Sequence, residues 1–278
     1  MSTMSVPSTA AIPPTGSSAT IRARPAGPFH DVRAIAGRAL RAVPKDLEAV
    51  VPPVLIAIFF FVVNVATLQQ LTEQTMPGLD YTAFQMPTAI LLGVTGVSRA
   101  PALVLDVQDG YLDRLLLTPI RRFAILLGHM CADVAVAASL TVPIIGLGYV
   151  LGVRFETGVV GVAVFIGMSA LWSLAFAGFG YAIALKTGNP AAVNSSFLLF
   201  FPFLFLTTSY VPRSQLSGWL DTVAGWNPVT YVLEGLRSLA LVGWDTGDLA
   251  KGFVAIALLG AISFSLCFAA LRSRVRAD

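Results

Sequence analysis

Residues 158–185 read GVVGVAVFIGMSALWSLAFAGFGYAIAL, and no charged side chain occurs between Glu156 and Lys186. A helix that crosses a membrane needs about 20 consecutive apolar residues, so this run is long enough to span a bilayer. The whole chain has the same character, since 56% of its 278 residues are hydrophobic and 12% are charged. Soluble domains contain about 25% charged residues. The composition therefore predicts an all-α protein that crosses the membrane several times.

Six apolar runs are candidate spans, and together they predict a membrane domain over residues 50–271. They cover residues 50–71, 82–104, 124–151, 158–185, 193–211 and 252–271. Arg99 and Pro101 interrupt the second run, and Pro202 is expected to kink the fifth. The aromatic run FLLFFPFLFL, residues 197–206, allows two interpretations. We favour packing against lipid or a neighbouring helix over contact with a hydrophobic substrate.

The segment before the first span divides into two parts. Residues 1–28 are rich in Pro, Ser, Thr and Ala without apolar periodicity, which predicts a disordered cytoplasmic tail. Residues 29–48 repeat apolar side chains at i, i+3 and i+4 spacing, with Arg and Lys between them. This pattern is typical of an amphipathic helix at the membrane interface. Pro44 is expected to end or kink it.

The basic residues predict the orientation of the spans. With six spans and a cytoplasmic amino terminus, 13 of the 18 Lys and Arg residues lie inside and four outside, and Arg99 lies near a boundary. Short cytoplasmic loops carry an excess of Lys and Arg. Both termini are therefore expected in the cytoplasm, the carboxyl terminus as a basic tail over residues 272–278.

Several chemistries lack the residues that they require. Cys131 and Cys267 lie inside apolar runs, and His30 is far from His129, so neither a disulfide framework nor a metal site is expected. No Gly-Lys dipeptide occurs, which excludes the phosphate-binding loop G-x-x-x-x-G-K-[ST]. The net charge of +3 is too small to indicate nucleic acid. We expect no catalytic residue and no cofactor bound by this chain.

A charged loop, DVQDGYLDRLLLTPIRRF, separates the second and third spans at residues 106–123. Leu112, Leu115 and Leu116 recur at helical spacing, which favours a short amphipathic helix, and the Thr118-Pro119 pair is expected to break it. Two interpretations remain open. The segment is either an ordinary charged cytoplasmic loop or a docking helix for a partner that pushes on the membrane domain.

A second polar stretch, NPVTYVLEGLRSL, lies before the last span at residues 227–239. Asn227 is expected at the N-cap of a helix and Pro228 at its first position. Glu234 and Arg237 are three residues apart, so they lie on one helix face and are expected to form an ion pair. We interpret residues 212–250 as a re-entrant or surface-lying helical hairpin that caps a translocation path.

Charged residues inside the spans need partners, because a charge at the bilayer centre costs at least ~2.5–3.5 kcal/mol. Asp133 lies in the third span, one turn after His129. The pair could contact substrate or couple protons, or Asp133 could be a protonated or hydrogen-bonded residue between helices. We favour the second interpretation. Arg99 and Asp106 are seven residues apart, and in a continuous helix they are expected to pair.

Three motifs, in this order, resemble the type-2 ABC exporter permeases, and the daunorubicin-resistance type most of all. They are DGYLDRLLLTPIRRFAILLGHM (109–130), LFLTTSYVP (204–212) and NP-x-TY-x-x-E-x-x-R (227–237). With the amphipathic helix and six spans, the resemblance covers about residues 29–275. One departure is that Asp106 and Val107 stand where many members carry Glu-Arg. Another is that Asp109 and Asp113 replace the commoner Glu.

The resemblance implies a function and two sets of site residues. The residues that couple to an ATPase would be Asp106, Asp109, Gly110, Asp113, Arg114, Thr118 and Pro119, and those of an outer lid would be Asn227, Pro228, Tyr231, Glu234 and Arg237. The implied partners are two ABC ATPase subunits, which use ATP and Mg, and a second permease chain, identical or related. The implied cargo is a hydrophobic drug or a lipid-like molecule, exported across the bacterial cytoplasmic membrane.

Three alternatives belong to other classes or other cargoes. A polysaccharide or lipid-linked glycan exporter shares the fold, and no motif distinguishes it. A CDP-alcohol phosphotransferase is excluded, because Asp113 stands at an alanine position of that signature and Ala137 replaces its last aspartate. A membrane scaffold that transports nothing is the third, and ATP-dependent substrate movement would distinguish it from an exporter.

Overall fold

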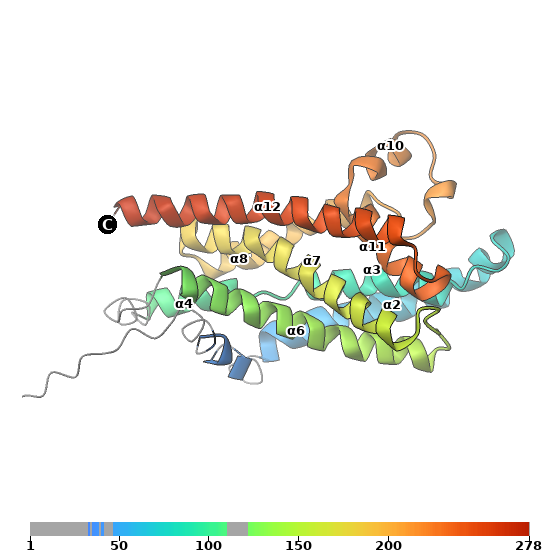
Figure 1. The fold of residues 1–278 in the computed structure, drawn as a ribbon, viewed down its shortest axis with the longest axis horizontal. Coiled ribbons are helices and arrows are strands. Elements are labelled where there is room, and N and C mark those ends of the chain that lie inside the picture. The colour runs from blue at the N-terminus through green and yellow to red at the C-terminus, as the bar shows by residue number, and fades with distance from the viewer. Residues whose placement is uncertain (1–32, 34, 39, 42–46, 110–121, 278) are drawn as a thin grey trace, which may run out of the picture.

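The described part of the chain is almost entirely helical. The computed structural model describes residues 33, 35–38, 40–41, 47–109 and 122–277, and it forms no strand over these residues. Figure 1 shows the long helices running side by side along the molecule. The helices are α2 (Leu47–Thr75), α3 (Tyr81–Thr95), α4 (Ala100–Gln108), α6 (Arg122–Val150), α7 (Gly158–Thr187), α8 (Pro190–Ser195), α9 (Phe200–Phe205), α10 (Trp219–Trp226), α11 (Pro228–Arg237) and α12 (Thr246–Ala277).

Five segments in the described residues are long and apolar enough to cross a membrane. They are Val50–Thr72, Tyr81–Asp106, Leu126–Val150, Gly158–Thr187 and Thr246–Ser273. These correspond to the first four predicted spans and the last one, which begins at Thr246 rather than at residue 252. The chain is therefore a multi-pass membrane protein.

The predicted span 193–211 is instead a shorter apolar segment, Pro190–Phe205, built from three pieces. A 3₁₀ turn, Ser196–Leu199, separates α8 from α9. Pro202 explains the position of this turn, because it has no N–H to donate to the carbonyl of Leu198 four residues earlier. After Phe205 the chain runs without regular helix to Pro212.

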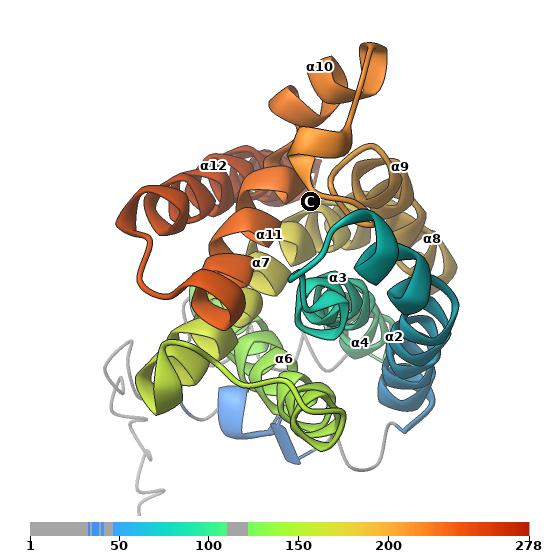
Figure 2. The same cartoon turned by 90° about the vertical axis from the view of Figure 1, so that its right-hand side faces the viewer.

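Helix α3 is the centre of the bundle. All of its residues, Tyr81–Thr95, are buried, and Figure 2 shows it surrounded by α2, α6, α7 and α11. The second span then breaks, since residues 96–99 are not helical and α4 begins at Ala100. Side chains of α7 bond to the end of α3: Ser173 Oγ donates to Val94 O over 2.8 Å, and Trp172 Nε1 donates to Thr95 Oγ1 over 2.8 Å.

Small residues bring α7 and α12 close together. A Cβ added at Gly178 would collide with the Ser263 side chain of α12. The Ser263 hydroxyl in turn donates to Ala175 O over 2.6 Å. Helices in membranes usually pack through small residues and interhelical hydrogen bonds, because the hydrophobic effect does not drive their association within lipid. The contact fixes the last span against the fourth.

The amino-terminal segment packs on the start of α6. The described residues between Arg33 and Arg41 are helical. Ile35 is buried, and a Cβ at Gly128 would collide with it. The predicted tail 1–28 and Pro44 lie outside the described residues. The helical hairpin predicted over 212–250 contains a short 3₁₀ turn (Arg213–Gln215), α10, α11 and a π-helical turn (Ser238–Val242).

We predict that Gly178→Leu separates α7 from α12, whereas Gly167→Leu on the same helix does not. Overpacking a close contact costs about 1–3 kcal/mol, and no atom lies within 4 Å of a Cβ at Gly167. In a thermal melt of the detergent-solubilised protein, the Gly178 variant should unfold several degrees lower. Equal melting temperatures for the two variants would contradict this packing.

Candidate functional site

Polar side chains gather in three places along the apolar bundle. Asp106 lies near the end at which α4 ends and α6 begins, which we call the coupling end (left in Figure 1). The end that carries α11 is called the lid end. Asp133 lies one turn further along α6 from His129, on the way from the coupling end.

At the coupling end, Asp106 joins three helical segments. Both Nη atoms of Arg38 donate to the Asp106 carboxylate, Nη1 to Oδ1 over 3.3 Å and Nη2 to Oδ2. Nε2 of His129, which is buried, lies 3.5 Å from Oδ2. A bidentate arginine–carboxylate pair fixes geometry as well as adding energy. Arg38 and Asp106 therefore hold the amino-terminal helix against α4, with α6 alongside.

The predicted pairing of Arg99 with Asp106 assumed a continuous helix, and this assumption is wrong. The chain is not helical over residues 96–99, so the seven-residue spacing does not place the two side chains on one face. Asp106 instead pairs with Arg38, which the sequence did not single out because 68 residues separate the two. Of the other residues expected to couple to an ATPase, Asp109 is exposed. Gly110, Asp113, Arg114, Thr118 and Pro119 lie outside the described residues.

In the middle of the bundle, Asp133 holds the broken second span in place. Its Oδ1 accepts from the backbone N–H of Arg99 over 2.7 Å, directly before α4, and its Oδ2 accepts from Tyr181 over 2.6 Å. Asp133 thus supplies the acceptor that the start of a helix needs. This geometry agrees with the interpretation of Asp133 as a hydrogen-bonded residue between helices. His129 faces Asp106, so the two residues serve different contacts.

At the lid end, Asn227 joins α9 to α11. As predicted, it is the N-cap of α11, and its Oδ1 accepts from Val229 N over 3.0 Å. Its Nδ2 donates to Phe203 O over 2.6 Å and to Leu206 O over 2.8 Å. The last carbonyls of a helix have no partner within that helix. Asn227 therefore satisfies the end of α9 and the start of α11 together.

The next polar residues of the motif bind the end of α10 in the same way. The Thr230 hydroxyl donates to Ala224 O over 2.7 Å, and the Tyr231 hydroxyl donates to Gly225 O over 2.6 Å. Thr230 also lies 2.5 Å from Thr207 Oγ1. The N-P-x-T-Y sequence thus ties α10, α11 and the chain after α9 into one unit. The role of Thr230 was missed, although the residue lies within the quoted motif.

Arg237 is buried and bonds to two other segments. Its Nε donates to Phe84 O over 2.9 Å and its Nη2 to Thr88 Oγ1 over 3.2 Å, both on α3. Nη1 and Nη2 also donate to Thr208 Oγ1 and Ser209 O over 3.1 and 3.4 Å. The guanidinium carbon lies 3.5 Å from the centroid of the Phe84 ring, a cation–π contact.

The predicted ion pair between Glu234 and Arg237 is not present. Within the described residues, no carboxylate oxygen lies within 4.0 Å of the Arg237 guanidinium. Burial lowers the pKa of Arg237 to about 9, so the side chain keeps its charge at neutral pH. Helical spacing gave the wrong partner because α3 and residues 208–209, distant in sequence, supply the acceptors.

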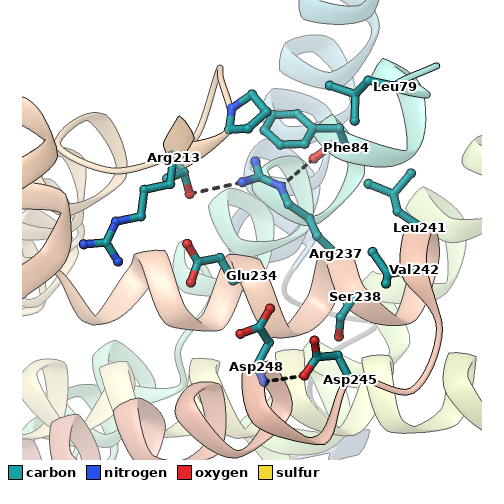
Figure 3. A pocket seen from close by; sticks show the side chains of 12 residues that line it. Leu79, Phe84, Arg213, Glu234, Arg237, Ser238, Leu241, Val242, Asp245 and Asp248 are labelled. Atoms are coloured by element: carbon teal, nitrogen blue, oxygen red, sulfur yellow. Dashed lines mark hydrogen bonds between the residues drawn. The ribbon is translucent and has the colours of Figure 1, made fainter. Parts of the chain in front are cut away.

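Glu234 and Arg237 face a common pocket of about 300 Å³ at the lid end. Figure 3 shows the Arg237 side chain extending toward Phe84, with Glu234 on the neighbouring turn of α11. Burial, and then the nearby Asp248, raise the pKa of the Glu234 carboxyl. Arg213, which also lines the pocket, pairs with Asp221 over 3.3 Å. The pocket therefore combines an apolar wall with charges of both signs.

In the part of the chain that the structure describes, no group of three His, Cys, Asp or Glu side chains is placed to hold a metal ion. Cys131 and Cys267 are free thiols, the first exposed and the second buried. The polar clusters consist of hydrogen bonds and ion pairs between helices. They hold the helices against one another.

Comparison with known proteins agrees with these features. Residues 31–241 match the family model for the ABC-2 type transporter. The chain is 26% identical to a probable doxorubicin resistance ABC transporter permease of Mycobacterium tuberculosis, over 72% of each chain. It is 26% identical to a daunorubicin resistance ABC transporter permease of Streptomyces coeruleorubidus, over 64% of this chain and 66% of the relative. A probable multidrug ABC transporter permease of Escherichia coli is 22% identical, over 72% and 55%.

We predict that Asn227→Ala destabilises the lid end more than Asn227→Ser. Serine keeps an N-cap acceptor but loses the amide donors to Phe203 and Leu206, whereas alanine loses both. A lost cap costs about 0.5–2 kcal/mol, and each unsatisfied buried carbonyl adds about 1–3 kcal/mol. Hydrogen exchange at the amides of α11 should be fastest in the alanine variant and intermediate in the serine variant. Wild-type exchange in both would contradict the assignment.

Proposed function

The chain belongs to the ABC-2 type transporter family, and on this premise we propose that it is the permease subunit of an ATP-driven exporter of hydrophobic drugs or lipid-like molecules. The observation that carries the proposal is the family match over residues 31–241, which includes the Asp106 cluster and all of α11. The relatives are named for resistance to doxorubicin and daunorubicin and for multidrug transport. This supports the cargo class.

The chain works with an ABC ATPase, as its family implies. We propose two copies of that subunit, which would bind ATP and Mg, and a second permease chain, identical or related. The chain itself lacks the Gly-Lys dipeptide of the phosphate-binding loop. Its proposed part is therefore to turn closure of the ATPases into movement of helices.

We propose that the coupling end faces the cytoplasm of a bacterial cell, with residues 29–48 lying on the membrane surface. The tails 1–28 and 272–278 would lie on that side too. Two observations support this. The excess of Lys and Arg falls in segments at this end. The described part of residues 29–48 packs on α6 and pairs with Asp106 at this end. The segment Pro190–Phe205 would complete the sixth crossing.

In the proposed mechanism, the ATPases press on residues 106–123 and on the amino-terminal helix. Because Arg38 pairs with Asp106, the two segments would move together with α4 as one unit. The break at residues 96–99 lets α4 tilt without unwinding α3. At the opposite end, residues 212–250 would form the outer lid, held closed by the contacts of Asn227 and Arg237.

The first test is affinity purification of the tagged chain from its native membrane in mild detergent. We predict that an ABC ATPase elutes in about equal amount. Replacing Asp109, Asp113 and Arg114 with Ala should remove it, because the triple variant deletes the charges of the coupling loop. The matched control replaces Asp221, Asp248 and Arg213 at the lid end, again two aspartates and one arginine, and should retain the ATPase. Absence of any ATPase would contradict the exporter and favour the scaffold.

A charge exchange tests the proposed transmission through Asp106. Arg38→Asp and Asp106→Arg each place two like charges together, so either change should reduce export of doxorubicin several-fold while the ATPase stays bound. The double variant restores an ion pair of opposite polarity and should recover much of the export. Doxorubicin accumulation in cells that express the complex measures this. Loss of the bound ATPase in the Asp106 variant would instead make Asp106 a direct docking residue.

A further inference from the structure

Arg237 is a buried cation whose hydrogen-bond acceptors are all uncharged. It donates to two backbone carbonyls and two threonine hydroxyls, while Glu234, one turn earlier, is only partly buried. We propose that Arg237 has two positions, latched on α3 when the lid is closed and paired with Glu234 when α11 leaves α3. This inference rests on the proposed function, since it assigns the residue that controls the lid.

The latched position joins three segments that are far apart in sequence. Arg237 itself is on α11, Phe84 and Thr88 are on α3, and Thr208 and Ser209 follow α9. Thr88 also donates to Ser209 O over 3.3 Å, so the acceptors are linked to one another. One guanidinium therefore joins α3, α11 and the chain that follows α9.

The opposite face of α11 is held differently. A Cβ at Gly235 would lie 3.0 Å from Asp248 O, and one at Gly252 would lie 3.0 Å from Tyr231 O. These glycines let α11 and α12 touch through their backbones, with no side chain that must be released. Helix α11 is thus held to α12 by close backbone packing, and to α3 by the hydrogen bonds of Arg237. If the lid opens, α11 is therefore expected to separate from α3, the helix to which Arg237 binds, and to stay packed on α12.

Leaving α3 would cost the guanidinium its two acceptors there, Phe84 O and Thr88 Oγ1, and a buried charge that loses partners is strongly destabilised. Glu234 is the nearest carboxylate on the same helix that could replace the lost acceptors, because residues three apart on a helix are neighbours. Both side chains line the same pocket (Figure 3), whose volume of about 300 Å³ leaves room for the guanidinium to turn. Glu234 accepts no hydrogen bond from Arg237 in the latched position and would stabilise the open one, so substitutions of the two residues should act in opposite directions.

The test measures the distance between α11 and α3 in the complete complex with its co-purified ATPase, in phospholipid nanodiscs. Spin labels are attached to cysteines placed at Val242, the last residue of the π-helical turn that follows α11, and at Leu71 on α2, which packs on α3. Both positions are exposed, and Cys131 and Cys267 are replaced by serine and alanine. Pulsed electron–electron double resonance gives the distribution of distances between the two labels, first without nucleotide and then with ATP plus vanadate. The variants are Arg237→Gln, Arg237→Lys and Glu234→Gln, with Arg213→Gln as the matched control in the same pocket.

Arg237→Gln should raise the long-distance fraction without nucleotide by about tenfold. The reason is that the loss of charge-assisted hydrogen bonds shifts the equilibrium between the latched and the open position by about this factor. Arg237→Lys should raise it less. Glu234→Gln should lower the long-distance fraction with ATP and vanadate several-fold and leave the nucleotide-free distribution unchanged. Arg213→Gln should match the wild type. If Arg237→Gln does not fold, Glu234→Gln carries the test, because it leaves every bond of the latch in place.

Two results would overturn the inference. One is a wild-type distribution in the Glu234→Gln variant with nucleotide, and the other is a shift of the Arg237 and Glu234 variants in the same direction. Failure of the proposed function has a different signature. There the wild-type complex itself shows no nucleotide-dependent change in distance and no ATP-dependent export of doxorubicin.

Discussion

In a bilayer, every backbone N–H and C=O that a helix does not bond must find a partner inside the protein. Among the described residues, regular helix stops at residues 96–99 and after Phe205, and each interruption would be costly if its backbone groups were left without partners. Asp133 bonds the N–H of Arg99, while side chains of α7 bond the end of α3. Asn227 bonds the carbonyls at the end of α9. The polar residues of this apolar protein are therefore concentrated where helices stop.

That distribution explains which features the sequence predicted and which it did not. Apolar length alone located four of the five candidate spans and most of the last one, Thr246–Ser273. Local rules placed Asn227 and Pro228 at the start of α11. Pairing failed wherever the true partner was remote. Asp106 was assigned to Arg99 on the assumption of an unbroken helix, and Arg237 was assigned to Glu234 on helical spacing. Side chains that satisfy a broken backbone come from other helices, and no spacing rule for one helix can identify them.

The arrangement also separates rigid contacts from movable ones. Contacts through glycine and serine, such as Gly178 with Ser263, leave no side chain to rearrange and hold helices at a fixed distance. Contacts through arginine, at Arg38 and Arg237, join segments by hydrogen bonds that can be exchanged for others. The two arginines lie at opposite ends of the bundle, with Asp133 and the broken second span between them. A transporter needs such a division, because some helix pairs must stay together while others part.

One buried cluster around α4 includes both Ile35 and Cys267, and this has a consequence for biogenesis. Ile35 belongs to a helix that is made before any span, and Cys267 belongs to the last span to leave the ribosome. The packing around α4 is therefore incomplete until α12 has been made. Early spans can enter the membrane in order, yet this cluster is completed only when α12 joins them. A nascent chain that lacks α12 thus leaves the apolar side chains around Cys267 uncovered at this end of the bundle.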